Sequence, residues 1–284
     1  MPTYTTTAPI DVAIDLQVGA IEIVAGNRND TVVIVSATNP DKEVDRRGAE
    51  QTTVEFDGQR LTITGPRPRL SWIGPSSYDS VDLTVEVPTA SRLTAEIAVG
   101  RLRATGRLGA TRIKSSTGAV ELDTTGDLWL RASHGTAIVG TAEGAAEITS
   151  DHGQIRVGTL GGDAILKASH GNVTVGEAGG DLDAKLSYGD LEITRARASV
   201  TAKTAYGSIQ LGEVSSGSIQ LESGYGQITV GIRPGVLAWL DVSAKNGRVR
   251  NELTGDHAAP SESEQTVAVR ARTHASDITI QRAR

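Results

Sequence analysis

Hydrophobic and polar residues alternate in short runs along most of this chain, and the runs recur at a nearly constant interval. The phrase Gly, any residue, apolar, any residue, apolar marks each copy. Its glycines are Gly100, Gly118, Gly135, Gly153, Gly171, Gly189, Gly207, Gly226 and Gly247. Successive glycines stand 18, 17, 18, 18, 18, 18, 19 and 21 residues apart. Alternation with a period of two is typical of a strand that buries one face, so each copy predicts a β-strand.

A second alternating segment precedes each glycine. Examples are Leu128-Leu130-Ala132, Ala164-Leu166-Ala168 and Leu182-Ala184-Leu186. Two such strands cannot bury their apolar faces within one coil, but stacked coils cover one another. The pattern therefore predicts an all-β fold, a single-domain parallel β-solenoid with about 18 residues and two short strands per coil. A right-handed helix is favoured, because parallel crossovers are usually right-handed.

The regular pattern covers only the middle of the chain, so we expect three parts within one domain. Residues 1–92 predict irregular β coils and a cap, with a Pro/Gly/Ser-rich loop at 65–80. Residues 93–250 predict the regular coils. Residues 251–284 predict a polar loop at 251–266 and two closing strands. Irregular capped ends are expected because a bare coil edge would recruit other strands.

The residue before each repeat glycine forms a second pattern. Down the stack these residues are Val99, Thr117, His134, His152, His170, Tyr188, Tyr206, Tyr225 and Asn246. Stacked coils would bring them into one column, and the six rings would stack at an offset, each pair contributing about 0.5–1.5 kcal/mol. We interpret them as a structural ladder, beside glycines that can turn the corner with a positive φ.

The histidines of the ladder also admit a metal-binding interpretation, since imidazole is a common ligand. His134, His152 and His170 are weak candidates, because three rings in a line about 5 Å apart do not converge on one tetrahedral ion. The sequence predicts no cofactor.

Composition restricts the classes of function. Aromatic residues make up 3% of the chain, and the core is expected to consist of Val, Ile, Leu and Ala. The net charge of −6 argues against nucleic acid as a partner. The sequence contains no apolar run long enough for a transmembrane helix and no signal-peptide pattern, so we expect a cytoplasmic protein without membrane contact. Phosphate-binding loops, metalloprotease motifs and nucleophile elbows are missing, and the outward strand positions show no focused acidic cluster. We predict no catalytic residues.

Two groups of apolar and aromatic residues are candidates for binding another protein. The first lies in the loop at 65–80, where Trp, Tyr and Arg, which are enriched in binding hot spots, occur together. The second faces outward from the predicted strands. The candidates are Arg67, Arg69, Trp72, Ile73 and Tyr78 in the loop, and Trp129 and Ile165 on the strands. Trp72 could instead fold back over the end of the stack.

The sequence resembles the bacterial putative-adhesin domain family of unknown function. The resemblance rests on Gly19-Ala20-Ile21-Glu22-Ile23, on Val85-Glu86-Val87-Pro88 and on the serial Gly-x-Ile-x-Val coils, and it spans residues 8–282. It implies a β-solenoid and carries over no catalytic residues.

Three hypotheses of function follow. The first is a non-catalytic, adhesin-like scaffold that binds a protein partner. The second is a structural protein that self-assembles end to end into homo-oligomers, because a solenoid with open ends can stack. The third is a β-helix that binds or cleaves carbohydrate.

Overall fold

The computed structural model describes residues 2–66, 79–253 and 266–283. In these ranges the chain contains strands β1–β25 and helix α1. It forms two compact units, Met1–Gly140 (unit 1) and Thr141–Arg284 (unit 2), which we describe in turn.

Unit 1 is built around two long parallel strands, β2 (Asp11–Gly26) and β7 (Arg92–Arg107). They pair from Asp11 opposite Arg92 to Val24 opposite Thr105, with Gly19 opposite Gly100. β8 (Thr111–Thr117) and β9 (Val120–Thr125) both pair with β7 in parallel, and β10 (Leu128–His134) pairs with β8. Each long strand thus combines the two strands of one coil, because the chain turns at the glycine without leaving the sheet.

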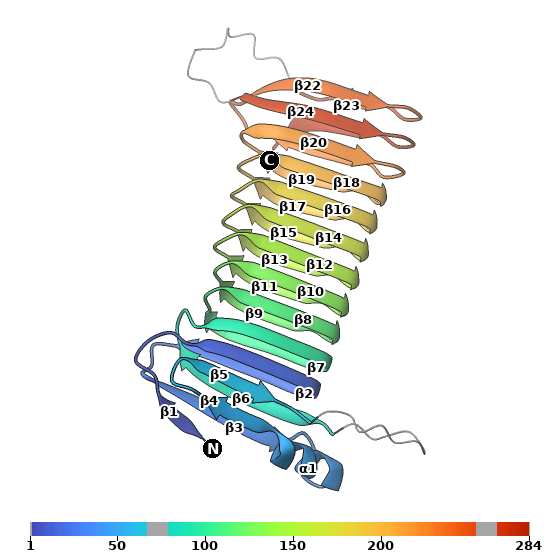
Figure 1. Cartoon of the computed structure of the whole chain (residues 1–284). Coiled ribbons are helices and arrows are strands. Elements are labelled where there is room, and N and C mark those ends of the chain that lie inside the picture. The colour runs from blue at the N-terminus through green and yellow to red at the C-terminus, as the bar shows by residue number, and fades with distance from the viewer. Residues whose placement is uncertain (1, 67–78, 254–265, 284) are drawn as a thin grey trace. The chain divides into compact units, whose positions relative to one another are not determined.

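The first 92 residues of unit 1 differ from the regular coils in strand direction. The remaining strands are β1 (Thr3–Thr5), β3 (Asp30–Ala37), β4 (Thr53–Phe56), β5 (Arg60–Thr64) and β6 (Val81–Pro88). β5 and β6 run parallel to β2, whereas β1–β3, β3–β6 and β4–β5 are antiparallel pairs. Helix α1 (Glu43–Gln51), which the sequence pattern did not predict, contacts β3 and β6 (Figure 1).

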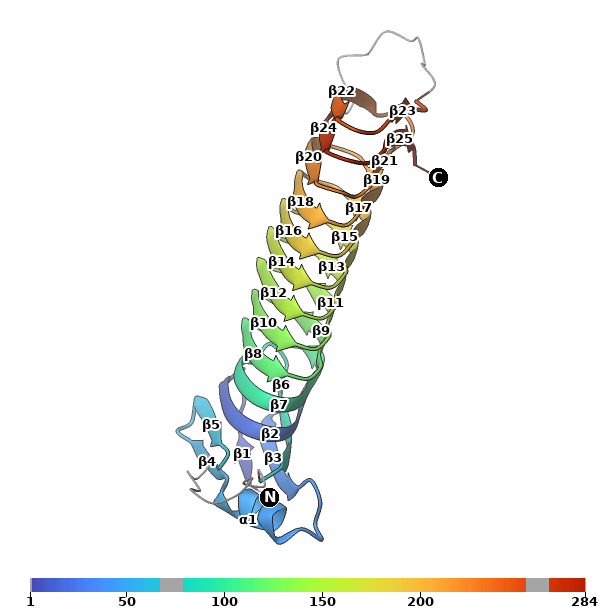
Figure 2. The same ribbon diagram turned by 90° about the vertical axis from the view of Figure 1, so that its right-hand side faces the viewer.

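β11 (Ala137–Ala142) leads from unit 1 into unit 2, where the coils are most regular. The strands of unit 2 are β12 (Ala146–His152), β13 (Ile155–Leu160), β14 (Ala164–His170), β15 (Val173–Ala178), β16 (Leu182–Tyr188), β17 (Leu191–Ala196), β18 (Val200–Tyr206), β19 (Ile209–Val214), β20 (Gly217–Ser223), β21 (Ile228–Ile232), β22 (Leu237–Ala244), β23 (Val249–Asn251), β24 (Thr266–Thr273) and β25 (Ile278–Arg282). β12, β14, β16 and β18 form one parallel sheet, and β13, β15, β17 and β19 form the other (Figure 2). The predicted parallel β-solenoid with two short strands per coil is confirmed.

The core of unit 2 lies between these two sheets and is thin. Ile148, Leu166 and Ala184 of one sheet are fully buried, as are Val175 and Ile193 of the other. All five occupy alternating positions, so each coil contributes a few aliphatic side chains that the coils above and below it cover. This arrangement explains how a chain with 3% aromatic residues can form a continuous core.

The corner between the two sheets requires glycine. At Gly171 the backbone has φ +143°, and a Cβ atom there would lie 1.9 Å from the carbonyl oxygen of Gly153 in the preceding coil. Gly189 has the same φ and the same close approach, 2.1 Å, to the carbonyl oxygen of Gly171. Stacked coils therefore touch backbone to backbone at this corner, which accounts for the repeat of the glycine itself.

The last coils of unit 2 are not in sequence order. The sequence predicts two closing strands within residues 251–284, and β24 and β25 lie in this range, but their place in the stack is not at its end. β24 pairs with β20 on one side and β22 on the other (Figure 1). β25 lies in the same way between β21 and β23. The coil of β24 and β25 is thus inserted into the stack, and the earlier coil of β22 and β23 forms the end of unit 2. The repeat pattern gave no sign of this exchange because β22 and β24 both carry the alternating apolar residues of an interior coil.

Candidate interaction surfaces

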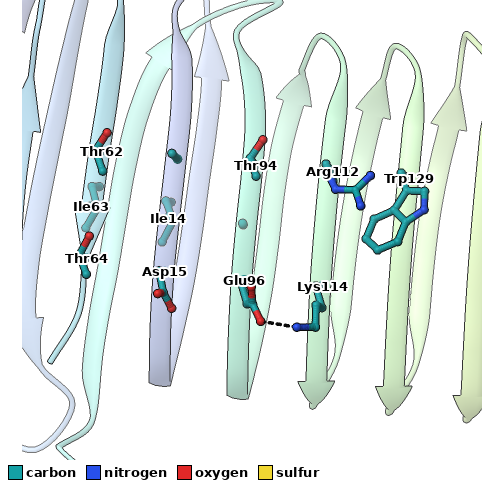
Figure 3. Close-up of a pocket in the computed structure, with 12 residues that line it drawn as sticks. Ile14, Asp15, Thr62, Ile63, Thr64, Thr94, Glu96, Arg112, Lys114 and Trp129 are labelled. Carbon is teal, nitrogen blue, oxygen red and sulfur yellow. Dashed lines mark hydrogen bonds and ion pairs between the residues drawn. The ribbon is translucent and has the colours of Figure 1, made fainter. Parts of the chain in front are cut away.

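A groove crosses the outer face of one sheet of unit 1 (Figure 3). β5, β2, β7, β8 and β10 lie side by side here, and their register aligns outward residues into two columns. The columns are Thr62, Ala13, Thr94, Arg112 and Trp129, and Thr64, Asp15, Glu96 and Lys114. The groove has a volume of about 340 Å³. The first column begins with the small residues Thr62, Ala13 and Thr94, which form the bottom of the groove. The larger side chains of Arg112 and Trp129 form the wall at one end.

The groove combines an aromatic ring with charges of both signs. The guanidinium carbon of Arg112 lies 3.7 Å from the ring centroid of Trp129, a cation–π contact that holds both side chains in place. Lys114 Nζ and Glu96 Oε1 form an ion pair of 2.5 Å. The carboxylate of Asp15 lines the same column and accepts a hydrogen bond from Gln17. Such a lining suits a polar ligand that offers hydroxyl groups.

Of the groove residues, the sequence predicted only Trp129 as an interaction candidate. Arg112 stands one coil before Trp129, and the coil register could have linked the two residues. Asp15 belongs to the irregular N-terminal strands, whose register follows no constant interval, so sequence reasoning could not place it beside Glu96.

The ring ladder of the sequence forms a stacked column in unit 2. His152 and His170 stack with ring centroids 4.8 Å apart and planes 2° from parallel. The pairs His170–Tyr188, Tyr188–Tyr206 and Tyr206–Tyr225 follow, each with 4.9 Å between centroids. The spacing equals that of neighbouring parallel strands, so the backbone register itself sets the stacking distance.

The tyrosines of this column are exposed. Tyr188, Tyr206 and Tyr225 are 49%, 47% and 58% accessible to solvent. Since the face of each ring is covered by its neighbours, the column presents ring edges and phenol hydroxyls. We call Tyr188, Tyr206 and Tyr225 the tyrosine column.

A row of three lysines runs along the same sheet, beside the tyrosine column. Lys167, Lys185 and Lys203 occupy one register position on β14, β16 and β18. They form ion pairs of 2.9–3.0 Å with Glu147, Asp183 and Glu222, in that order. The row is thus a series of solvent-exposed ion pairs and does not form a continuous positively charged surface.

The column continues differently from the sequence prediction at the end of unit 2. Because β24 follows β20 in space, His274 comes next to Tyr225, with ring centroids 6.4 Å apart and planes tilted by 51°. Asn246 comes one coil later, and its N–H donates a hydrogen bond to the carbonyl oxygen of His274. In unit 1, the residues before the glycines are also in register, Val99 opposite Thr117 and Thr117 opposite His134.

The three histidines considered as metal ligands lie in both units. His152 and His170 face each other as flat, parallel rings, an arrangement that supports stacking. His134 ends β10 in unit 1. Among the described residues, no group of three or more His, Asp or Glu side chains is arranged to hold a metal ion.

The remaining interaction candidates have two outcomes. Ile165 lies on β14, 40% exposed, with Glu147 and Asp183 as its register neighbours in unit 2. It is a single apolar side chain among charges. The loop candidates Arg67, Arg69, Trp72, Ile73 and Tyr78 fall outside the described residues.

Side chains with shifted pKa values lie near the first strands of unit 1. Hydrogen bonds and ion pairs with Asp30 and Glu86 raise the pKa of Arg28, and Arg28 in turn lowers the pKa of Asp30. The backbone N–H groups of Gln59 and Arg60 donate to the Asp57 carboxylate and lower its pKa. Each shift arises from an ion pair or a turn that joins strands.

No curated protein matches the chain significantly. The solved structures that match include three with sequence identities of 10–12% and TM-scores of 0.21–0.39. The first is described as a putative cell adhesion protein from Clostridium sporogenes (12% identity, 99% of this chain and 98% of that one, TM-score 0.21). The second is described as a putative lipid binding protein from Parabacteroides distasonis (10%, 97% and 95%, TM-score 0.39). The third is described as a putative adhesin from Bacteroides fragilis (11%, 98% and 95%, TM-score 0.32).

The single helix of the described ranges, nine residues long, is too short to cross a membrane. The model of the Toastrack DUF4097 family, a family of unknown function, matches residues 12–282, nearly the same span as the resemblance predicted from the sequence. The repeated coils, the corner glycines and this match agree, and the chain belongs to the Toastrack DUF4097 family.

Proposed function

We propose that this chain is a non-catalytic, adhesin-like scaffold that binds a protein partner through the tyrosine column of unit 2. The observation that carries the proposal is the exposure of Tyr188, Tyr206 and Tyr225 in one stacked row. Tyrosine is enriched at binding hot spots because its ring supplies contact area and its hydroxyl supplies a hydrogen bond.

The stack favours binding in a second way. A side chain that is free in solution loses rotamer entropy when a partner immobilises it, about 0.5–1.5 kcal/mol for each flexible side chain. Tyr206 is already held between two parallel rings at 4.9 Å, so most of this cost is met when the protein folds. A rigid row of tyrosine rings with centroids 4.9 Å apart is preorganised for a partner whose hydrogen-bond groups repeat at the spacing of neighbouring β-strands.

The test compares two triple variants. In the first, Tyr188, Tyr206 and Tyr225 are replaced by alanine. In the second, Thr174, Gln210 and Thr229, which share one outward column on the other sheet, are replaced by alanine. Immobilised wild-type and variant proteins are incubated with native extract, and bound proteins are quantified by mass spectrometry. Circular dichroism establishes that both variants fold.

The expected result is a partner that binds the wild type and the control variant alike and binds the tyrosine variant at least about tenfold less, a loss of about 1.4 kcal/mol. Equal recovery of all bound proteins by both variants would refute the role of the tyrosine column.

A second candidate function is saccharide binding in the groove of unit 1. The observation in its favour is the lining, where the Trp129 ring and the Arg112 guanidinium contact each other and the Asp15 carboxylate lies two strands from Arg112, beside small residues. Sugar hydroxyls pair with carboxylates and guanidinium groups, and sugar C–H groups pack on aromatic rings. A glycan array probed with the wild type and with Trp129→Ala tests this function. Binding that Trp129→Ala abolishes supports it, and an array without binding removes it.

A further inference from the structure

β22 and β23 form the end of unit 2, and there the apolar side chains that face the core are partly exposed. β22 pairs with β24 along one edge, and no described strand pairs with its other edge. By register with the buried Val269 and Ala271, the inward residues of β22 are Leu240 and Val242. Both are only partly buried, whereas the inward residues of the inserted β24 are fully covered.

Two further side chains extend this apolar end. Trp239 is 60% exposed, and Val249 of β23 is 42% exposed although its register partner Ile278 is fully buried. The terminal coils of repeat proteins are normally polar on their outer face, because an open apolar end lowers solubility. An unpaired strand edge also leaves backbone N–H and C=O groups that favour a further strand. We call Leu240, Val242, Trp239 and Val249, with the free edge of β22, the end face.

Unit 1 shows what a covered end looks like in the same chain. There the parallel strands are followed by antiparallel pairs, β1 with β3 and β3 with β6, and helix α1 contacts β3 and β6. The stack of unit 2 lacks such a change of strand direction among its described residues, and its last coil keeps the alternating apolar pattern of an interior coil.

We propose that the end face binds the end face of a second copy of this chain, through a two-fold axis that pairs β22 with β22 in antiparallel orientation. A strand can pair with its own copy in this way only if its inward positions meet inward positions. The register that places Leu240 opposite Leu240 of the second copy meets this condition, and it brings Ala238 opposite Val242. The inward residues of β22 are thereby covered by those of the second copy.

The charges of the end face also suit this register. Asp241 would face Trp239 of the second copy rather than another Asp241, which avoids a like-charge pair. Each Asp241 carboxylate is already neutralised by its own chain, since Arg270 lies 2.9 Å and Arg272 3.6 Å away. Because both copies use the same surface, the contact closes as a dimer and does not propagate into a filament.

This dimer stands apart from the proposed function, since the end face contains none of the tyrosine column. If both exist, the dimer carries two tyrosine columns, and a partner with repeated binding sites would bind by avidity.

The first test is the oligomeric state of the full chain, measured by sedimentation velocity over a range of concentrations. The wild type is expected to form a dimer that dissociates on dilution. Leu240→Lys and Trp239→Asp are each expected to raise the dimer dissociation constant at least about tenfold. Ile165→Lys is the matched control, because Ile165 is an exposed apolar residue on a side of unit 2 and its replacement should leave the dimer unchanged. Melting curves show whether each variant folds, and Trp239 is exposed enough for substitution without loss of the core.

The second test fixes the register. The chain contains no cysteine, so each introduced thiol is unique. Opposed residues of an antiparallel pair lie within the Cα range that a disulfide spans. Leu240→Cys should therefore form a covalent dimer under mild oxidation, whereas Ser243→Cys on the same strand should not. A wild-type monomer at all concentrations, a filament, or a dimer that survives both end-face variants would overturn the proposal. Crosslinking of Ser243→Cys in preference to Leu240→Cys would overturn the register.

Discussion

Replacement of a corner glycine is the sharpest test of how the coils stack. In Gly171→Ala, the new Cβ would lie 1.9 Å from the carbonyl oxygen of Gly153, far inside van der Waals contact. The backbone also has φ +143°, a conformation that L-residues rarely adopt. To relieve the contact, the coils must separate at the corner, where the Gly153 N–H donates to the His170 carbonyl oxygen at 2.9 Å. We therefore expect strain and hydrogen-bond loss to act together.

The magnitude follows from these two terms. A residue held in a sparsely populated backbone region costs about 1–3 kcal/mol, and a lost backbone hydrogen bond costs about 1 kcal/mol. Gly171→Ala should thus lower the free energy of unfolding by about 3 kcal/mol, which corresponds to a fall in Tm of roughly 6–12 °C for a unit of this size. Thermal melting followed by circular dichroism measures the change.

Substitutions at two further glycines separate the cost of backbone strain from the cost of the close contact between coils. Gly235 has φ +81°, and a Cβ added there would have no heavy atom within 4 Å, so Gly235→Ala should show backbone strain alone, about 1–2 kcal/mol. Gly26 has neither a positive φ nor a close neighbour, so Gly26→Ala should be neutral within about 0.5 kcal/mol. If Gly171→Ala is no more destabilising than Gly235→Ala, close backbone contact between coils does not explain the repeat glycine.

Three other predictions concern separate features. Tyr206→Ala removes two ring contacts and should lower the free energy of unfolding by about 1–3 kcal/mol, whereas Tyr206→Phe, which keeps the stack, should melt as the wild type does. Deletion of residues 266–284 removes β24 and β25 from the interior of unit 2, so amide exchange in β22 should become fast; protection equal to that of the full chain would contradict the inserted topology. The pKa of Asp57 is lowered in the folded protein. The ionised carboxylate should therefore stabilise the fold at pH values above the ordinary pKa of Asp, and this stabilisation should be lost as the pH falls through the lowered, folded-state pKa. The difference in urea midpoint between wild type and Asp57→Ala should therefore be larger at pH 7 than at pH 2; an equal difference at both would contradict it.

Much of the fold could be predicted because one repeat interval in the regular coils determines two things. It gives the position of each strand and the strand with which it pairs. An interval of 18 residues between Gly153 and Gly171 specifies both the strand positions and their neighbours. The same interval placed the rings of His170 and Tyr188 in one column. Where the interval fails, the prediction fails for a physical reason.

Helix α1 illustrates the failure in unit 1. Its sequence has no apolar stripe, and its buried residues are Asp45 and Gly48. The Asp45 carboxylate accepts hydrogen bonds of 3.2 Å from the backbone N–H groups of Asn39 and Ser80. The helix is thus held by polar contacts with residues up to 35 positions away, and no periodicity in the sequence reports such contacts.

The inserted coil of unit 2 also sets the order of events when the protein is made. β22 and β23 leave the ribosome before β24 and β25, yet the later strands separate them from β20 and β21. Coils up to β21 can assemble one after another during translation. The following coil has no place to dock until residues through Ile280 have emerged, because its only described neighbours are β24 and β25. Completion of unit 2 therefore waits for the synthesis of β24 and β25, and the earlier segment docks only after the later one.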